Sequence, residues 1–435
     1  MLPAILRAVI ANSWNIRNGR ILDPVSGRDE TADLLVNDGV IAPADANTAN
    51  VPELDASGLL VVPGLIDLHV HFREPGKEDA ETVESGSAAA ARGGFTTVVT
   101  MPNTTPAIDT PERVADMIRR AASCGKVRVL PCGCLTRDRK GRELADIRGM
   151  ARAGAAAVSD DGDTLADRKL MADAMRTAAA AGLVVMDHAL DPGQAGDGVM
   201  LQGATADRLG LPGISPDAEP AIVERDIELA EETGARIHIQ HVSSARSADL
   251  LRAARLKGLH VSGELTPHHL ALVDEDIVEP DPNMKMNPPL GSRVDRDALV
   301  RAAIDGVLQA FATDHAPHTA KSKGKGFIDA PFGVVGLETA VGVTYTRLVT
   351  TGLLPLMEWL RGWTAGPAAV LDITPPSMAP GRPADITILD IESEWVVDSA
   401  AFLSKSSNTP FQGLPLHGRA VHTFLAGIQT WRKPG

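Results

Sequence analysis

Two histidines separated by a single residue, His69 and His71, follow an apolar run. In a β-strand, residues i and i+2 point to the same face, so this spacing presents two imidazole nitrogens to one ion. Arg73 continues the period toward the next loop, where its guanidinium can bind a carboxylate through two hydrogen bonds. The alternatives are histidines satisfied within the core, and an Arg73 that pairs with Glu74 or Glu78. The segment predicts a metal site beside an anion contact.

The rest of the chain indicates how such residues would be positioned. Eight apolar runs with strand character alternate with alanine-rich helical segments, which predicts a (β/α)₈ barrel over residues 63–370. The runs begin at Leu65, Thr96, Val127, Ala156, Leu183, Arg236, His260 and Val307. Residues 1–62 and 371–435 instead show short strands and turn signals, including the pairs Asn18-Gly19 and Asp38-Gly39. We therefore expect a small β-sandwich formed by the N- and C-terminal segments.

Four further ligand-type residues stand where predicted barrel strands end. Asp161, His188, His241 and Asp314 close the fourth, fifth, sixth and eighth runs. Barrel active sites are built at this end of the strands. Together with His69 and His71 they make four histidines and two carboxylates, a donor set that suits zinc. The pattern predicts a site for one or two zinc ions, with Asp161 able to bridge two.

Several stretches resemble dihydroorotases of the amidohydrolase superfamily, in particular the bacterial type I branch. The resemblance covers nearly the whole chain and is carried by DLHVHFREPG (67–76), MPNT (101–104), SDDG (159–162), TPHH (266–269), KMNPPL (285–290), ATDHAPHTAKSK (312–323), APFGVVGLET (330–339) and NTPF (408–411). It implies reversible cyclisation of N-carbamoyl-L-aspartate to (S)-dihydroorotate and water, a step of de novo pyrimidine biosynthesis.

The resemblance also implies a role for each matching residue. The first zinc would be held by His69, His71 and Asp314, the second by His188 and His241, with Asp161 bridging and Asp314 also acting as acid and base. Substrate contacts would come from His71, Arg73, Asn103, Asn287 and His318, and from the backbone of Phe332 and Gly333. Gly291 departs from the family, which often has arginine there, and this puts a nearby loop contact in doubt.

Two other functions remain as alternatives. Hydantoinases and allantoinases are similar, but usually bridge their metals with a carboxylated lysine on the fourth strand. Here Asp160 and Asp161 stand at that point, and the nearest lysine, Lys169, falls in the next predicted helix. A non-catalytic homologue that scaffolds aspartate carbamoyltransferase need not keep six ligands. A complex with that enzyme, and a homodimer, are left open.

Composition limits the remaining classes. A formal net charge of -14 argues against a nucleic-acid or anionic membrane surface, and so an anionic substrate needs local positive charge. No apolar run is long enough for a membrane span, and the start of the chain is expected to be a short extension or an extra N-terminal turn. Together these features predict a cytoplasmic protein. The three cysteines, Cys124, Cys132 and Cys134, do not make a disulfide framework, and Cys132 and Cys134 are expected to be buried thiols rather than half of a metal site.

Two features leave open interpretations. The adjacent His268 and His269 fall in a predicted strand, so at most one should point inward. The basic segment from Lys321 to Lys325 is either a solvated mobile loop or a lid over the substrate.

Overall fold

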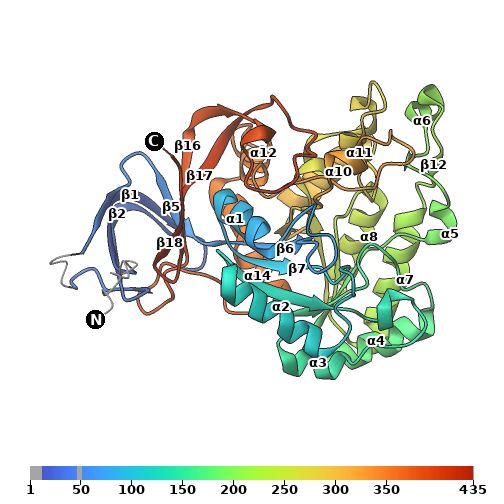
Figure 1. Cartoon of the computed structure of the whole chain (residues 1–435), viewed down its shortest axis with the longest axis horizontal. Coiled ribbons are helices and arrows are strands. Elements are labelled where there is room, and N and C mark those ends of the chain that lie inside the picture. Colours follow the sequence, from blue (N-terminus) through green and yellow to red (C-terminus); the bar gives the residue numbers. More distant parts are fainter. Residues whose placement is uncertain (1–11, 47–50, 435) are drawn as a thin grey trace, which may run out of the picture.

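The computed structural model describes residues 12–46 and 51–434; the expected N-terminal extension falls on residues 1–11, outside this range. Eight parallel strands form one sheet in chain order, and a parallel bridge between Val70 and His315 joins its two edges into a nearly closed barrel (Figure 1). The strands are β6 (Leu65–Val70), β7 (Phe95–Thr100), β8 (Arg128–Gly133), β9 (Ala157–Val158), β10 (Val184–Asp187), β13 (Ile237–Ile239), β14 (Val261–Leu265) and β15 (Ala310–Phe311). Each corresponds to one of the eight predicted runs, so the predicted barrel is confirmed.

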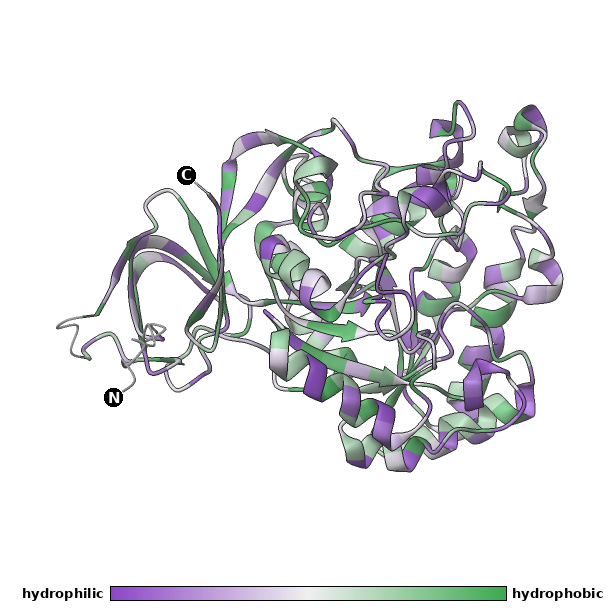
Figure 2. Cartoon of the chain, in the orientation of Figure 1, coloured by the Kyte–Doolittle hydropathy of each residue, from purple (hydrophilic) through white to green (hydrophobic). Residues whose placement is uncertain are grey.

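Helices surround these strands and turn apolar faces toward them (Figure 2). They are α1 (Val83–Gly93), α2 (Pro111–Cys124), α3 (Ile147–Ala153), α4 (Arg168–Ala180), α7 (Ala218–Thr233), α8 (Ala245–Leu256), α10 (Arg293–Ile304), α13 (Leu356–Trp363) and α14 (Ala365–Leu371). In α1 the Thr82 hydroxyl accepts from the Ser85 amide, and Gly94 ends the helix with φ 95°, where a side chain would be strained. Ala89, Ala90 and Ala91 are buried, so alanine lets α1 lie close to the barrel.

Strands from both chain ends form one further sheet, in the order β18-β17-β16-β5-β1-β2-β3, with β4 paired to β1. Their bounds are β1 (Trp14–Asp23), β2 (Arg28–Asn37), β3 (Val40–Ile41), β4 (Glu53–Asp55), β5 (Leu60–Pro63), β16 (Ile386–Val396), β17 (Pro415–Leu425) and β18 (Ile428–Arg432). The N-terminal β5 pairs with the C-terminal β16, and buried side chains such as Ile21, Val61 and Phe424 form a separate core. The two ends thus build one β unit beside the barrel (Figure 1). The exact domain limits, 1–62, 63–370 and 371–435, stay predictions.

The two expected hairpin turns have different outcomes. Asp38 and Gly39 do form the turn between β2 and β3, both with positive φ. Asn18 and Gly19 lie inside β1, where the register with β2 shifts, and therefore form a bulge rather than a hairpin. A left-handed Asn18 (φ 61°) suits either structure, so the dipeptide alone could not distinguish them.

Short elements fill the loops that follow the barrel strands. They are α5 (Pro192–Ala195), β11 (Met200–Leu201), α6 (Ala204–Leu209), β12 (Gly213–Ile214), α9 (Pro267–Ala271), α11 (Ala320–Lys323) and α12 (Ala340–Thr344). Among the described residues, no helix has the length and apolar character needed to cross a membrane.

Candidate metal centre and substrate cavity

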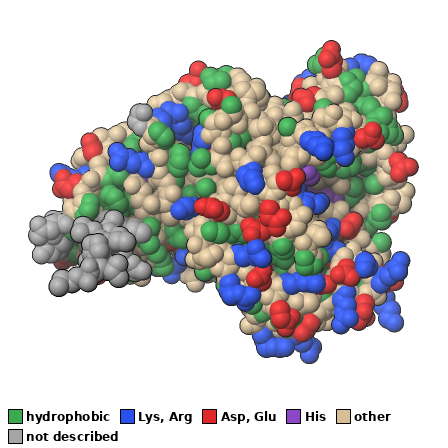
Figure 3. Space-filling model, viewed as in Figure 1, with side chains coloured by type: hydrophobic (Ala, Val, Ile, Leu, Met, Phe, Trp, Pro, Cys, Tyr) green, Lys and Arg blue, Asp and Glu red, His purple; other side chains and the backbone are tan. Residues whose placement is uncertain are grey.

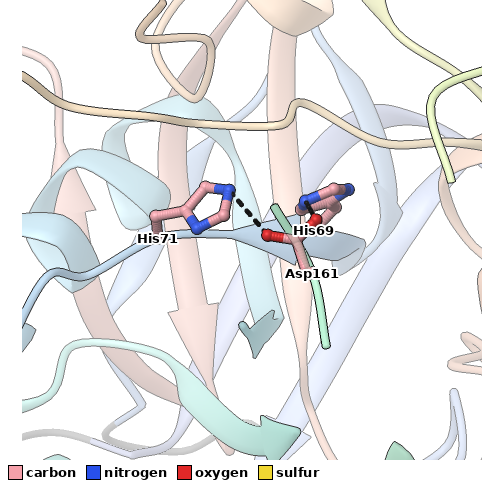
Figure 4. A group of neighbouring side chains, drawn as sticks. All are labelled: His69, His71 and Asp161. Atoms are coloured by element: carbon pink, nitrogen blue, oxygen red, sulfur yellow. Dashed lines mark ion pairs between the residues drawn. The ribbon is translucent and has the colours of Figure 1, made fainter. Parts of the chain in front are cut away.

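The six predicted ligand residues lie together at one end of the barrel. His69 is the last residue but one of β6, and the others follow the ends of their strands, as the parallel arrangement requires. Two groups have donor atoms that all lie within 4.8 Å of one another: His69, His71 and Asp161, and Asp161, His188 and His241. Figure 4 shows Asp161 between the two histidines of the first group. Since Asp161 belongs to both groups, it stands where a bridging carboxylate is expected.

The two carboxylates face the histidine nitrogens. Nε2 of His69 lies 3.2 Å from Asp161 Oδ1 and 3.5 Å from Asp314 Oδ1. Nε2 of His71 lies 3.1 Å from Asp314 Oδ1 and 3.6 Å from Asp161 Oδ2. On the other side, Nδ1 of His188 is 3.8 Å from Asp161 Oδ1. All these side chains are buried, so the cluster is a preformed polar centre rather than a solvated surface.

The electrostatics and unpaired atoms of this centre fit a bound cation. Burial lowers the pKa of His71, His188 and His241, so these rings are neutral and can offer lone pairs. Nδ1 of His188 and Nε2 of His241 lie only 2.8 Å apart. Nε2 of His69 has no hydrogen-bond partner among the described residues, despite the carboxylates beside it. A buried ring nitrogen without a hydrogen-bond partner, set among further histidine nitrogens and carboxylates, is what a zinc ion would satisfy.

A buried carboxylate that sequence reasoning missed supports the centre from behind. Glu264, on β14, accepts at 2.8 Å from His69 Nδ1, at 3.0 Å from His238 Nε2 and at 3.1 Å from the His241 amide. Burial raises its pKa, but the hydrogen bonds from His238 and His69 outweigh this and lower it to about 2. Glu264 thus orients two predicted ligands. The available signal was a charged residue in the middle of an apolar barrel strand.

Backbone strain occurs at three of the same strand ends. Arg73, His241 and Asp314 have φ of 60°, 34° and 47°, in the left-handed region that residues with a β-carbon rarely adopt. Each follows a strand, and the turn directs its side chain into the barrel mouth. Such strain persists where surrounding contacts over-determine it, as at functional sites.

A cavity of about 170 Å³ opens beside the ligand cluster. Figure 3 shows histidine atoms at the bottom of a hollow on this face, next to charged side chains. Every predicted site residue except His69 lines it, and two unpredicted residues, Gly162 and Ala316, complete the wall. Arg73 is buried and donates from Nε to the Pro317 carbonyl at 3.2 Å. Burial lowers its pKa to about 10, so it stays cationic at neutral pH. Neither Glu74 nor Glu78 pairs with it in the described structure.

The predicted substrate contacts are already partly engaged by the protein. His318 donates from Nε2 to the Phe332 carbonyl at 2.7 Å, and burial together with Arg73 lowers its pKa to about 2. The Gly333 amide donates to the Lys285 carbonyl at 2.9 Å. Gly333 has φ 115°, and a β-carbon there would lie 2.5 Å from the Ala316 β-carbon, so only glycine fits. The contacts of His318, Phe332 and Gly333 with substrate stay predictions.

The two asparagines contact metal-ligand candidates. Asn103 donates from Nδ2 to Asp161 Oδ2 at 3.0 Å, and its Oδ1 lies 2.9 Å from His71 Nδ1. Asn287 lies 3.1 Å from His188 Nε2. Both side chains therefore hold the outer sides of the cluster while lining the cavity, and their contact with substrate stays a prediction.

The expectations for the adjacent histidines and for the basic segment from Lys321 to Lys325 need correction. His268 and His269 are not in a strand: Pro267 and the Thr266 cap start the short helix α9, and both histidines are buried.

The segment after Thr319 begins as helix α11, and its Lys323 is not solvated. Its ammonium donates to the carbonyls of Pro282 at 2.8 Å and Pro331 at 3.0 Å. A solvated loop is therefore wrong for Lys323, whereas Lys321 and Lys325 are exposed.

The remaining expectations concern small residues. Cys132 and Cys134 are buried free thiols as predicted, and Cys124 is half-buried. At Gly291 a β-carbon would lie 2.9 Å from the Ser243 carbonyl oxygen and 2.8 Å from the Asp295 β-carbon. The local backbone is therefore packed around glycine and leaves no room for the family's arginine without a shift.

Comparisons with known proteins point to one family. The family model described as dihydro-orotase-like matches residues 58–247. The dihydroorotase of Pelotomaculum thermopropionicum is 47% identical, covering 95% of this chain and 97% of the relative. The dihydroorotase of Geobacillus kaustophilus is 45% identical, covering 90% and 91%.

Solved structures give the same fold. The L-hydantoinase of Arthrobacter aurescens superimposes with a TM-score of 0.86 at 26% identity, covering 97% of this chain and 96% of that one. The dihydropyrimidinase of Brevibacillus agri has a TM-score of 0.84 at 21% identity, covering 97% and 95%, and supports the barrel fold alone. With near-complete coverage at more than 40% identity to named dihydroorotases, this chain belongs to the dihydroorotase family of cyclic amidohydrolases.

Proposed function

We propose that this enzyme is a zinc-dependent dihydroorotase, which interconverts (S)-dihydroorotate and N-carbamoyl-L-aspartate in de novo pyrimidine biosynthesis. The observation that carries the proposal is one cavity whose wall unites five of the six ligand-type side chains with the cationic Arg73, while the sixth, His69, lies against Asp161. A substrate that is a cyclic amide with a carboxylate needs both: metal ligands beside the amide and a cation for the carboxylate. Relatives named dihydroorotase support the same substrate.

The donor set fits a zinc centre of one or two ions. His69, His71, Asp161 and Asp314 would hold one ion, and Asp161, His188 and His241 the other. Bound zinc would supply Lewis acidity that polarises the amide carbonyl and makes water a better nucleophile.

Arg73 would bind and orient the substrate carboxylate. Its guanidinium lies in the cavity wall, stays charged and is fixed by the Pro317 carbonyl. A planar fork held in this way can donate two parallel hydrogen bonds to a carboxylate, which fixes the ring's orientation as well as its position. Because the Arg73 guanidinium is buried, its attraction for the substrate carboxylate would be stronger than in water. This would explain how a protein of negative net charge binds an anion.

Asp314 would move the proton. In hydrolysis its carboxylate takes a proton from the attacking water and delivers it to the ring nitrogen as the amide carbon–nitrogen bond breaks. In ring closure the protonated carboxyl group gives its proton to the departing hydroxyl, which leaves as water, and the carboxylate so formed accepts the proton that the attacking carbamoyl nitrogen releases as the carbon–nitrogen bond forms. Asp314 suits this role because it lines the cavity beside the histidines. His318 suits it less, because its low pKa keeps it neutral and its Nε2 proton is engaged by Phe332.

A hydantoinase activity is the second candidate, since solved hydantoinases share the fold. The residues at the end of the fourth barrel strand, where hydantoinases usually have a carboxylated lysine, disfavour a hydantoinase activity. Asp161 points into the centre, while Asp160 accepts from the Leu135 and Thr136 amides and points away. Lys169 is exposed on α4 and cannot replace a bridging carboxylated lysine.

The test is an assay of purified protein with dihydroorotate and with hydantoin, in both directions for the former, alongside metal analysis of the same sample. We expect turnover of dihydroorotate with bound zinc and little or no hydantoin hydrolysis. Preference for hydantoin would replace the proposed substrate. Failure with both, in protein that holds its metals, would favour the non-catalytic scaffold.

We propose further that the protein acts in the cytoplasm. We also propose that the cavity works within one chain, because one chain supplies every residue of its wall. A homodimer or an aspartate carbamoyltransferase complex would then modify activity rather than complete the site. Sedimentation of the protein alone and mixed with that enzyme, with activity measured in parallel, tests this.

A further inference from the structure

Asn408 comes from the C-terminal segment between β16 and β17 and ends beneath the substrate cavity. Its side chain is 5% exposed. Nδ2 donates to the carbonyls of Ala316 and Gly333, both at 3.1 Å, and Oδ1 accepts from the His318 amide at 3.1 Å. The side chain therefore uses both donors and one acceptor position on two different loops.

These loops carry the substrate-facing residues of the cavity wall. The first holds Pro317, whose carbonyl fixes Arg73, and His318. The second holds Phe332 and Gly333, and Phe332 in turn accepts from His318. Asn408 thus joins the loops from behind at the side of the cavity where Arg73 lies.

The segment around Asn408 is itself anchored to the barrel. Ser406 donates to the Ala80 carbonyl at 2.8 Å, and the Lys405 amide donates to the buried Glu81 at 3.2 Å. The Val335 amide donates to the Asn408 carbonyl at 2.9 Å. A side chain fixed on both sides can hold its partners in a set position, as a free loop residue cannot.

We propose that Asn408 is a positioning residue that sets the spacing between the 316–318 and 332–333 loops, and thereby the fit of the carboxylate end of the substrate. The inference rests on the proposed dihydroorotase function. Asparagine is specific for this role, because it offers two donors to two carbonyls and an acceptor to an amide at once. Aspartate keeps the acceptor and loses both donors.

The first measurement is hydrogen exchange of the substrate-free enzyme. Asn408→Ala removes the acceptor of the His318 amide, and exchange in the peptide that contains His318 should become about tenfold faster or more. The matched control is Ser407→Ala, the adjacent exposed residue, which should leave that exchange unchanged. Unchanged exchange in Asn408→Ala would overturn the tether.

The second measurement is steady-state kinetics with dihydroorotate in variants of normal metal content. We expect the KM of Asn408→Ala to rise about tenfold while kcat changes less than about threefold, because the metal ligands and Asp314 keep their own contacts. A merely structural role would instead lower the active fraction at constant KM, and that result would overturn the proposal. If Asn408→Ala does not fold, Asn408→Asp, of equal size, should show the same rise in KM.

The wild-type enzyme separates this inference from the proposed function. Wild-type turnover of dihydroorotate with no KM change in the variants overturns the inference alone. No wild-type turnover of dihydroorotate overturns the proposed function, and with it the substrate role of Asn408, whatever the exchange data show of the tether.

Discussion

Nδ1 of His69 lies 2.8 Å from Oε1 of Glu264, which joins β6 to β14 across the barrel. Both side chains have no exposed surface. The bond places the ring proton on Nδ1 and leaves the Nε2 lone pair facing Asp161 and Asp314. The carboxylate on β14 therefore decides which nitrogen of His69 is available to a metal.

Glu264→Gln should weaken metal binding. The amide cannot accept strongly from both His69 and His238, and so the His69 tautomer is no longer fixed. We expect metal affinity to fall about 10- to 100-fold, as for other residues that orient a ligand. Chelator competition measures this, with the exposed Glu279→Gln as control. Equal affinity of Glu264→Gln and wild type would show that the ring is oriented by other contacts.

Arg73→Lys should impair substrate binding without loss of metal. Lysine keeps the charge but loses the planar fork and the Nε hydrogen bond to Pro317. We expect KM for dihydroorotate to rise at least about tenfold, or roughly 1.4 kcal/mol of binding free energy. The exposed Arg119→Lys serves as control. Unaltered kinetics at full metal content would make Arg73 a structural residue.

Asp314→Asn should stop proton transfer in both directions. Asparagine cannot take a proton at neutral pH, so we expect kcat to fall about 10²- to 10⁴-fold in hydrolysis and in closure. Asp314 is also a ligand candidate, and metal content must therefore be measured in the same sample. In the wild type, hydrolysis should gain as pH rises and closure as pH falls, with apparent pKa values of the coupled centre. Near-normal rates in a metal-loaded variant would leave Asp314 as a ligand only.

Lys323 should make stability depend on pH. Burial, with the nearby Lys285 ammonium, lowers its pKa to about 7 from the ordinary 10.5. Between these values the unfolded chain binds more protons than the folded one, so the free energy of unfolding rises with pH, by at most about 1.4 kcal/mol per pH unit. The contribution of neutral Lys323 to the free energy of unfolding is complete above pH 10.5 and is lost as pH falls through 7.

Melting temperatures of the wild type and of Lys323→Met, measured from pH 6 to pH 10, check this window. The difference between their pH slopes is the informative quantity, because methionine also removes hydrogen bonds to Pro282 and Pro331. Lys321→Met, which changes an exposed lysine of the same helix, should keep the wild-type slope. Parallel slopes for wild type and Lys323→Met would show that Lys323 titrates at its ordinary pKa.

The sequence by itself determined the barrel and the ligand-type residues at its mouth. Hydrophobic periodicity is local, so eight strand runs could be counted, and the strand period already places His69 and His71 on one face. Asp161, His188, His241 and Asp314 follow from the rule that parallel strands end at the same rim. No pairwise contact had to be known.

Tertiary structure decided everything that depends on partners distant in the chain. Glu264 meets His69 across 195 positions, and Asn408 meets His318 across 90, and no local pattern encodes such pairs. Local signals also failed where two conformations share the same dihedral angles or composition. Asn18-Gly19 formed a bulge because β2 continues opposite it, and Lys323 became buried because carbonyl groups of Pro282, 41 positions away, and of Pro331 surround its ammonium. In each case the long-range packing, rather than the residue's own preference, chose the outcome.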